Sequence, residues 1–299
     1  MAWGGPVSFC GLELAHPVVN GSGTFDAVAA RRAFGDALLE DFPFSAFVSK
    51  TITLEPRAGN PPPRLWETPA GMINSIGLPN KGLDGYLAED LPALAELPVP
   101  LVTNVMGSTG AELSALVEAV DARDEVAAVE LNVSCPNVKT GLDIGADPDS
   151  LAAVLREVRP RTRKPLIVKL TPNTADVSLV AQAAEAEGAD AVSLINTLRA
   201  MALAPDGSGL PWLGGGTGGL SGPAVRAVAL AQVAAVARRV SVPIVGMGGI
   251  QTGVHAADFL RAGATLVAVG TESFRDPRAG ARIAAELRDL SAKSGITVG

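Results

Sequence analysis

The chain has 299 residues, of which 47% are hydrophobic and 18% are charged. This much apolar material excludes intrinsic disorder, which needs low hydrophobicity and high net charge. The formal net charge of −7 argues against nonspecific binding to nucleic acid or to an anionic membrane surface. We therefore expect a folded protein with no nucleic-acid partner, in which any anionic ligand is held by a local site.

Targeting signals and metal motifs are not found in the sequence. The first basic residue is Arg31, and no apolar run approaches the ~18 residues of a membrane-spanning helix. The two cysteines, Cys10 and Cys135, make neither a disulfide framework nor a four-cysteine zinc site. We expect a cytoplasmic protein without a membrane partner and without a metal, because a reducing compartment suits two unpaired thiols.

Three segments repeat apolar residues at i, i+3, i+4 and i+7, the pattern of a helix with one buried face. These segments are residues 113–120, 151–158 and 177–184. Thr109 followed by Glu112 predicts a capping box, and Asp147 before Pro148 predicts an N-cap with proline at the first helical position. The chain therefore carries several amphipathic surface helices.

Between the helices lie short runs that are apolar on both faces. They are residues 16–20, 47–48, 101–105, 127–133, 166–170, 191–195, 244–247 and 266–269. Such alternation predicts buried parallel strands joined by crossover helices. About eight strands is the number in a closed (β/α)8 TIM barrel. An open, doubly wound sheet is the alternative, because periodicity does not show closure.

The same reading gives the domain organisation. Residues 7–9 and 12–14 indicate a small N-terminal β-hairpin that would plug the bottom of the barrel. No linker or charge block divides the chain, so we expect one α/β domain over residues 1–299. Two βα loops, residues 53–85 and 197–222, are long and rich in Gly and Pro. Long loops of this kind are where barrel enzymes build their sites.

The strand ends carry polar residues that a barrel core does not require. Active sites of these barrels lie at the carboxyl ends of the strands, and convergent polar groups mark a pocket. Each such residue taken alone also fits a strand-end cap or a turn. The polar strand-end residues are Asn20, Ser22, Lys50, Thr51, Asn104, Asn132, Lys169, Asn196 and Thr197.

An anion site is indicated after the last two strands. Gly248-Gly249 and Gly270-Thr271 stand where this barrel usually binds phosphate, since glycines let backbone N–H groups approach an anion. Two tight turns would give the same residues. Lys50 and Lys169 each end a strand, and a lysine facing the barrel mouth needs an anionic partner.

Cys135 is the candidate base. It lies past a strand end, in a loop that runs to Asp147, as a reactive thiol on a lid would. Neither His16, next to Pro17, nor His255, in a helix, is placed for acid–base work. Without a histidine, the thiol is the natural group to remove a proton.

The chain resembles the class 1 dihydroorotate dehydrogenases over nearly its whole length. The resemblance rests on residues 20–25, 49–53, 74–80, 132–139, 196–197, 218–223, 246–250 and 269–271. Among them, the motifs around Asn74 and Cys135 are the most specific. The resemblance implies a barrel that holds flavin mononucleotide (FMN) and oxidises dihydroorotate to orotate in pyrimidine synthesis, with Cys135 as the base.

Residue by residue, the resemblance implies two sets of contacts. It assigns the flavin to Ser22, Lys50, Thr51, Asn104, Asn132, Lys169, Ile195, Gly222, Gly248, Gly249, Gly270 and Thr271. It assigns the substrate to Lys50, Asn74, Ser75, Ile76, Gly77, Leu78, Asn132, Asn196 and Thr197.

The loop over residues 137–148 resembles subclass 1B, which passes electrons to NAD through a partner subunit carrying FAD and an iron–sulfur cluster. A homodimer is also implied. The sequence departs from subclass 1B in two places, and both bear on the electron acceptor and on docking of the partner subunit. Gly141-Leu142 stands in place of paired glycines, and residues 204–216 are unusually rich in Gly. The alternatives are the fumarate-using subclass 1A, a flavin enzyme for uracil-like pyrimidines, a nucleotide-oxidising barrel with a covalent cysteine, and a flavin-binding subunit without turnover.

Overall fold

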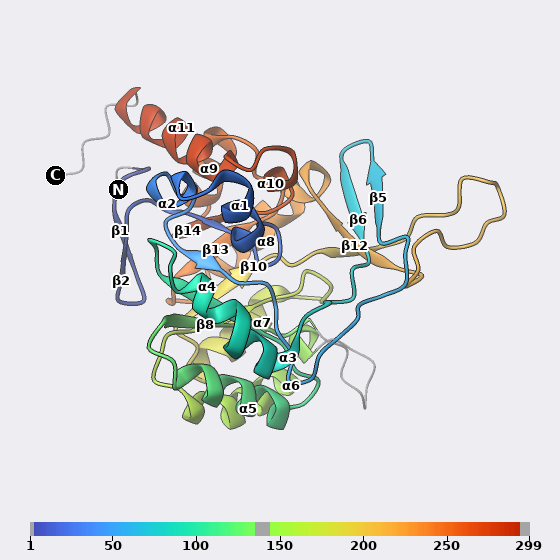
Figure 1. Ribbon diagram of the computed structural model, residues 1–299, viewed down its shortest axis with the longest axis horizontal. Coiled ribbons are helices and arrows are strands. Elements are labelled where there is room, and N and C mark those ends of the chain that lie inside the picture. Colours follow the sequence, from blue (N-terminus) through green and yellow to red (C-terminus); the bar gives the residue numbers. More distant parts are fainter. Residues whose placement is uncertain (1–2, 135–143, 294–299) are drawn as a thin grey trace.

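The computed structural model describes residues 3–134 and 144–293. The barrel strands lie at its centre, with helices around them (Figure 1). They form an eight-stranded parallel sheet in the order β3-β14-β13-β10-β9-β8-β7-β4. The strands are β3 (Val18–Asn20), β4 (Phe47–Val48), β7 (Leu101–Val105), β8 (Val126–Asn132), β9 (Leu166–Lys169), β10 (Ala191–Leu194), β13 (Ile244–Met247) and β14 (Leu266–Val269). Every predicted barrel strand is confirmed to within two residues at either end.

The sheet closes on itself, as a TIM barrel does. The first and last strands in the order, β3 and β4, meet through a backbone hydrogen bond from Ser45 N to Val18 O of 3.0 Å. The side chain of Asn20 continues the junction by bonding the backbone of Val48. The barrel is therefore confirmed over the open-sheet alternative.

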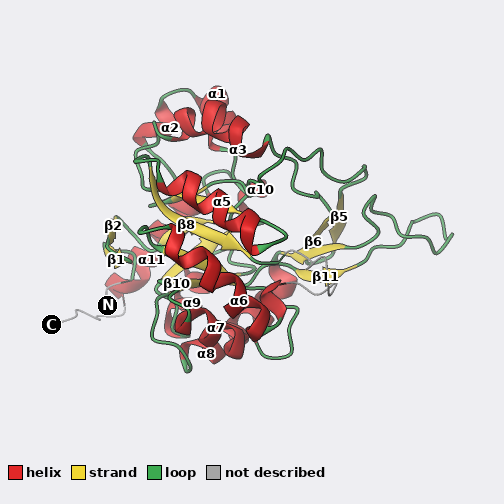
Figure 2. Cartoon of the chain, turned by 90° about the horizontal axis from the view of Figure 1, so that it is seen from below, coloured by secondary structure: helices red, strands yellow, loops and turns green. Residues whose placement is uncertain are grey.

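Helices surround the barrel (Figure 2). The longest helices between barrel strands are α5 (Gly110–Asp121), α6 (Pro148–Val158), α7 (Val177–Ala186), α8 (Arg226–Ala237) and α9 (Gly253–Arg261). The predicted stripes face the core, and the predicted caps form: Thr109 Oγ1 accepts from Glu112 N at 3.1 Å and Asp147 Oδ2 from Ser150 N at 2.8 Å.

The remaining helices are short, except for the C-terminal one. They are α1 (Ala27–Phe34), α2 (Ala37–Glu40), α3 (Gly82–Gly85), a π-helical turn (Tyr86–Asp90), α4 (Leu91–Leu94), α10 (Glu272–Arg275) and α11 (Ala279–Lys293). Single 3-10 turns cover Ile144–Ala146, Arg159–Arg161 and Pro223–Val225. No helix in the described part of the chain is long and apolar enough to cross a membrane.

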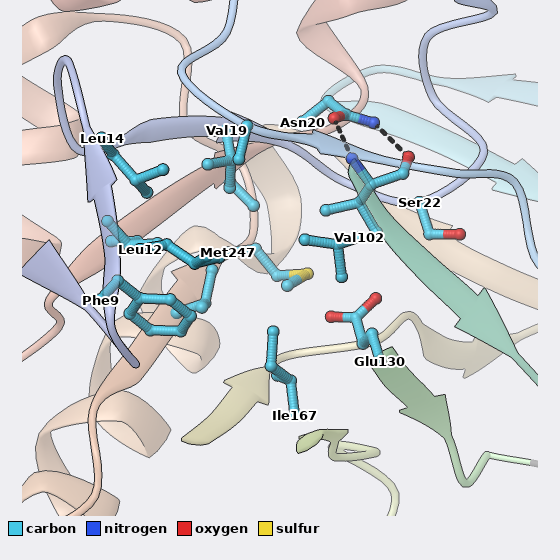
Figure 3. Close-up of a pocket in the computed structure, with 15 residues that line it drawn as sticks. Phe9, Leu12, Leu14, Val19, Asn20, Ser22, Val102, Glu130, Ile167 and Met247 are labelled. Carbon is cyan, nitrogen blue, oxygen red and sulfur yellow. Dashed lines mark hydrogen bonds between the residues drawn. The ribbon is translucent and has the colours of Figure 1, made fainter. Parts of the chain in front are cut away.

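The predicted hairpin forms as β1 (Val7–Phe9) and β2 (Leu12–Leu14), paired antiparallel. Its Phe9 and Leu14 join a buried cluster with inward side chains of the barrel strands, such as Val102 and Ile167. Between the hairpin and the barrel interior a cavity of about 20 Å³ remains (Figure 3). The hairpin therefore closes the amino-terminal end of the barrel, and a site must open at the other end.

The two long βα loops are not irregular, which the sequence did not reveal. They contribute β5 (Leu65–Thr68) and β6 (Gly71–Asn74), and β11 (Leu198–Ala200) and β12 (Gly218–Ser221). These strands make one antiparallel sheet in the order β11-β12-β6-β5, which lies on the side of the barrel away from the hairpin (Figure 1). The two loops thus support each other beside the carboxyl ends of the barrel strands.

Candidate functional site

Two asparagines meet at the carboxyl ends of neighbouring strands. Asn132 ends β8, and Asn196 follows β10. Asn196 Nδ2 donates to Asn132 Oδ1 at 3.2 Å and to Ser134 Oγ at 3.0 Å. Asn196 Oδ1 in turn accepts from Thr197 N at 2.9 Å. These contacts fix both amides, so three predicted substrate residues do lie together.

The two predicted lysines differ in exposure. Lys169 ends β9 next to Asn132, with which it is in register, and only 7% of it is exposed. Lys50 is exposed after β4. Neither ammonium has an acidic partner among the described residues. A mostly buried lysine at a strand end, without an acidic partner among the described residues, is suited to an anionic or electron-rich ligand.

Ser22 and Thr51 also lie together, although 29 residues separate them in sequence. Their hydroxyl oxygens are 3.3 Å apart, and Ser22 Oγ donates to Ser49 O at 2.8 Å. Ser22 follows β3 and Thr51 follows β4, so the pair spans the junction where the barrel closes. Two hydroxyls side by side offer both donors and acceptors to a ligand.

The two glycine turns follow β13 and β14, as predicted. Gly249 has φ of +67°, and a Cβ there would lie 2.7 Å from the carbonyl oxygen of Gly222. Thr271 is tied to β12, because its Oγ1 donates to Ser221 Oγ at 2.9 Å. A side chain at Gly249 would collide with the Gly222 backbone, and a Cβ on Gly222 would lie 3.5 Å from Thr271 Cγ2. The predicted residues Gly222, Gly249 and Thr271 therefore lie together, with Gly248 and Gly270 next to them in sequence.

The segment after β6 is held in an unusual backbone conformation. Leu78 has φ of +55°, which a leucine rarely adopts, and Gly77 has φ of +75°. Asn74 Nδ2 donates to Gly219 O at 3.2 Å, and Ser75 Oγ donates to Thr217 O at 2.8 Å. Strained backbone that its surroundings hold in place is typical of ligand-binding segments. Ile76 lies within this same segment.

Two asparagines that the sequence analysis did not select shape that segment. Asn80 Oδ1 accepts from Gly82 N at 2.8 Å, and its Nδ2 donates to Leu78 O at 2.9 Å. Asn60 Nδ2 donates to Ser75 O at 3.1 Å. Asn80 is the last residue of the motif over residues 74–80, and this membership was the only indication in the sequence that Asn80 belongs to the site. Asn60 gave none, because a lone polar loop residue is common.

A third residue that was not predicted, Arg282, contacts the segments that follow the two glycine turns. Arg282 on α11 donates to Gln251 O at 2.9 Å, just after one turn. It also bonds Glu272 at 3.2 Å, just after the other. A single guanidinium thus joins the two turns, with its several donors in one fork. Its distance in sequence from both turns hid this role.

A bound cofactor would satisfy groups that are otherwise unpaired. Asn104 on β7 is fully buried, and its Oδ1 has no donor in the described part of the chain. An unpaired buried carbonyl costs roughly 1–3 kcal/mol. Lys169 has no acidic partner among the described residues, and the glycine turns carry no Cβ that would keep a phosphate away from the backbone. A planar, polar ring that carries a phosphate, as FMN does, fits this set of groups.

The remaining predicted residues are Ile195 and Cys135. Ile195 is buried, and its backbone N donates to Met247 O at 3.0 Å, so it forms part of the barrel wall. Cys135, the predicted base, lies outside the described residues. The other thiol is not a rival, because burial and the Asp190 carboxylate raise the pKa of Cys10 to about 11.

Within the ranges 3–134 and 144–293, no group of three His, Cys, Asp or Glu side chains is arranged to hold a metal ion. His16 contacts the backbone of Val18 near the start of β3, and His255 lies on α9. Neither imidazole joins the group of polar residues at the strand ends.

Comparison with known proteins places these features in context. A family model described as dihydroorotate dehydrogenase matches residues 6–290. The chain is similar to the protein named dihydroorotate dehydrogenase B (NAD(+)), catalytic subunit, from Geotalea daltonii, with 46% identity over 97% of this chain and 94% of that one. Proteins of the same name in Geobacter sulfurreducens and Desulforudis audaxviator are 45% and 46% identical, over 97% of this chain and 94% and 93% of theirs.

Proposed function

The chain belongs to the dihydroorotate dehydrogenase family, and we propose that it is an FMN-containing catalytic subunit of the NAD-linked B type. The enzyme oxidises dihydroorotate to orotate, a step of pyrimidine biosynthesis. The observation that carries the finer proposal is the hydrogen-bonded pair of Asn132 and Asn196 beside Lys169, which is 7% exposed and has no acidic partner among the described residues.

The substrate is a cyclic ureide that bears a carboxylate. Such a ring offers alternating N–H donors and carbonyl acceptors, which asparagine amides match because each has both. Asn74, Asn132 and Asn196 are the amides proposed for this role, with Thr197 and the segment from Ser75 to Leu78 around them. Lys50, which has no acidic partner among the described residues, is the proposed partner of the substrate carboxylate.

Oxidation removes a proton from C5 and a hydride from C6, so that the C5–C6 single bond becomes a double bond. FMN, when bound, accepts the hydride. Cys135 is the proposed base that takes the C5 proton on its thiolate. It follows Ser134 in sequence, whose hydroxyl accepts from Asn196 at 3.0 Å. Ser134, which contacts the proposed substrate residue Asn196, and the proposed base Cys135 are thus neighbours in the sequence.

The remaining predicted residues are proposed to hold FMN. Gly248, Gly249, Gly270 and Thr271 would bind its phosphate through backbone N–H groups, with Gly222 keeping the turn open. Ser22, Thr51, Asn104, Asn132 and Ile195 would contact the ring. Lys169 would stabilise negative charge on the ring from its buried position at the end of β9.

Electron transfer to NAD requires a second polypeptide in this proposal. The relatives are named catalytic subunits of NAD-linked enzymes. The sequence holds only two cysteines, too few for an iron–sulfur cluster of its own. An electron-transfer subunit with FAD and an iron–sulfur cluster is the proposed partner, and a homodimer of this chain the proposed core of the assembly.

One experiment distinguishes this proposal from a fumarate-using enzyme of the A type and from an enzyme for another pyrimidine. The pure chain is reduced anaerobically with dihydroorotate, and NAD, fumarate and a quinone are then offered in separate reactions. We expect reduction by dihydroorotate, no rapid turnover with NAD alone, and NAD turnover once an electron-transfer subunit of a B-type relative is added. Rapid turnover with fumarate would move the chain to the A type, and reduction by dihydrouracil but not dihydroorotate would replace the substrate.

A further inference from the structure

A buried acid in the barrel interior has no part in the mechanism above. Glu130 on β8 is 4% exposed, and its carboxylate points into the small cavity among aliphatic side chains such as Val102, Ile167 and Met247 (Figure 3). Removing a carboxylate from water is costly unless hydrogen bonds replace the water. A sequence selected for packing alone would place an aliphatic residue there.

Two hydrogen bonds hold the carboxylate, and each comes from another barrel strand. Oε2 accepts from Asn104 Nδ2 on β7 at 2.5 Å. Oε1 accepts from Ser193 Oγ on β10 at 2.7 Å. Glu130 therefore links three strands of the barrel below the carboxyl-end site. Its partners Asn104 and Ser193 lie 26 and 63 residues away in the sequence.

The contact with Asn104 fixes which way its amide points. The amide NH2 can only donate, and it donates to Glu130, so the amide oxygen must face elsewhere. That oxygen is buried and has no donor in the described residues. Without Glu130, the amide could rotate by half a turn and present its NH2 group instead. The carboxylate thus decides whether this buried position holds an acceptor or a donor.

The oxidised isoalloxazine ring has a single ring N–H, at N3. A buried acceptor that has no donor in the described residues, such as Asn104 Oδ1, matches that one donor. We infer that Glu130 is a positioning residue that holds the Asn104 amide with its oxygen toward the flavin, where it accepts the N3–H hydrogen bond. This inference rests on the proposed function, because it requires FMN in the barrel.

The test is a double-mutant cycle on the full chain, read as the FMN dissociation constant from flavin fluorescence. Glu130→Leu and Asn104→Ala should each weaken FMN binding about 3- to 10-fold, the usual scale of one hydrogen bond. Glu130→Leu in the Asn104→Ala background should cost nothing more. Losses that add would overturn the inference, because a merely structural acid acts independently of Asn104.

Two further variants are matched to the first. Glu130→Gln keeps an oxygen for Asn104 Nδ2 and an N–H for the Ser193 hydroxyl, so FMN binding should stay within about twofold of wild type. Ser193→Ala removes the other partner of the same carboxylate and should also stay within about twofold. A loss in Glu130→Gln or Ser193→Ala as large as in Glu130→Leu would contradict a role through Asn104.

If Glu130→Leu does not fold, Glu130→Ala replaces it in the double-mutant cycle with Asn104→Ala. A spectroscopic measurement then tests the inference independently of the dissociation constants. The 15N signal of FMN labelled at N3 should move in Asn104→Ala and move alike in Glu130→Ala. A signal unchanged by Asn104→Ala overturns the inference while leaving the proposed function intact. A wild-type chain that binds no FMN overturns the proposed function, and this inference with it.

Discussion

The side chain of Asn20 stands in for a peptide group in the barrel wall, where it bonds both backbone groups of Val48 (Figure 3). Its Nδ2 donates to Val48 O at 2.8 Å, and its Oδ1 accepts from Val48 N at 2.8 Å. Asn20 is fully buried. The Asn20 amide thus continues the junction of β3 and β4, which the backbone bond from Ser45 N to Val18 O begins, up to the level of the site.

Removing that amide should destabilise the fold. Asn20→Ala leaves a buried N–H and a buried C=O of Val48 without partners, which together cost about 2–5 kcal/mol. The free energy of unfolding in urea measures the loss. Ser45→Ala is the matched control at the same junction, since it removes a hydroxyl but keeps the backbone bond to Val18, and it should cost about 1 kcal/mol. Equal losses in the two variants would show that Asn20 does not close the barrel.

Cys135→Ala should keep its flavin and lose dihydroorotate oxidation by about 10²- to 10⁴-fold, the usual effect of removing one positioned base. Anaerobic stopped-flow measurement of flavin bleaching isolates this step. Cys135→Ser should retain slight activity that rises with pH, because an alcohol is a far weaker acid than a thiol. Bleaching of Cys135→Ala at the wild-type rate would remove the thiol from the mechanism.

Lys50→Ala should weaken orotate binding more than uracil binding, because only orotate carries a carboxylate. The loss of one charge-assisted contact costs about 1.5–3 kcal/mol. Dissociation constants of both ligands on the same variant give the comparison. Lys81→Ala removes a lysine that pairs with Glu89 and Asp90, and should change neither constant. An equal loss of both ligands in Lys50→Ala would assign Lys50 to the flavin alone.

His16 should make the fold less stable in mild acid. Burial, aided by the charge of Arg288, lowers the pKa of His16 from 6.5 to about 4. Between these values the unfolded chain takes up a proton that the folded chain does not. The stabilisation is therefore complete above pH 6.5 and is lost as the pH falls toward 4, up to about 3 kcal/mol.

The measurement is urea unfolding at pH 7.5 and pH 4.5. Wild type should lose about 2–3 kcal/mol more between these values than His16→Gln, in which no imidazole titrates. Carboxyl groups titrate alike in both proteins, so the difference between them isolates His16. Parallel losses in the two proteins would mean that the imidazole does not titrate with a lowered pKa.

Much of the barrel could be predicted from the sequence, because its signals are local. The run at residues 244–247 is β13, and the apolar stripe from Leu113 is the buried face of α5. Strand ends are local too, which is why Asn132, Lys169 and Asn196 were recognised as candidates. Their meeting at one end of the barrel follows from the parallel arrangement of the strands.

What escaped prediction depends on partners far away in the sequence. Glu130 lies inside a run that was predicted only as an apolar strand, and its two partners come from other strands. Asn20 was selected as a polar strand end, whereas the structure uses it to close the barrel. The pairing of β6 with β12 joins two loops that carry no alternating apolar pattern. No local pattern encodes such contacts.

The central claim is that this barrel holds FMN and that dihydroorotate reduces it. One equivalent of dihydroorotate, added anaerobically to the purified chain, tests it directly, with the released flavin identified by chromatography and orotate quantified. The account predicts one FMN per chain, bleached with the formation of one orotate. Released FAD, or FMN that dihydroorotate leaves oxidised, would contradict it.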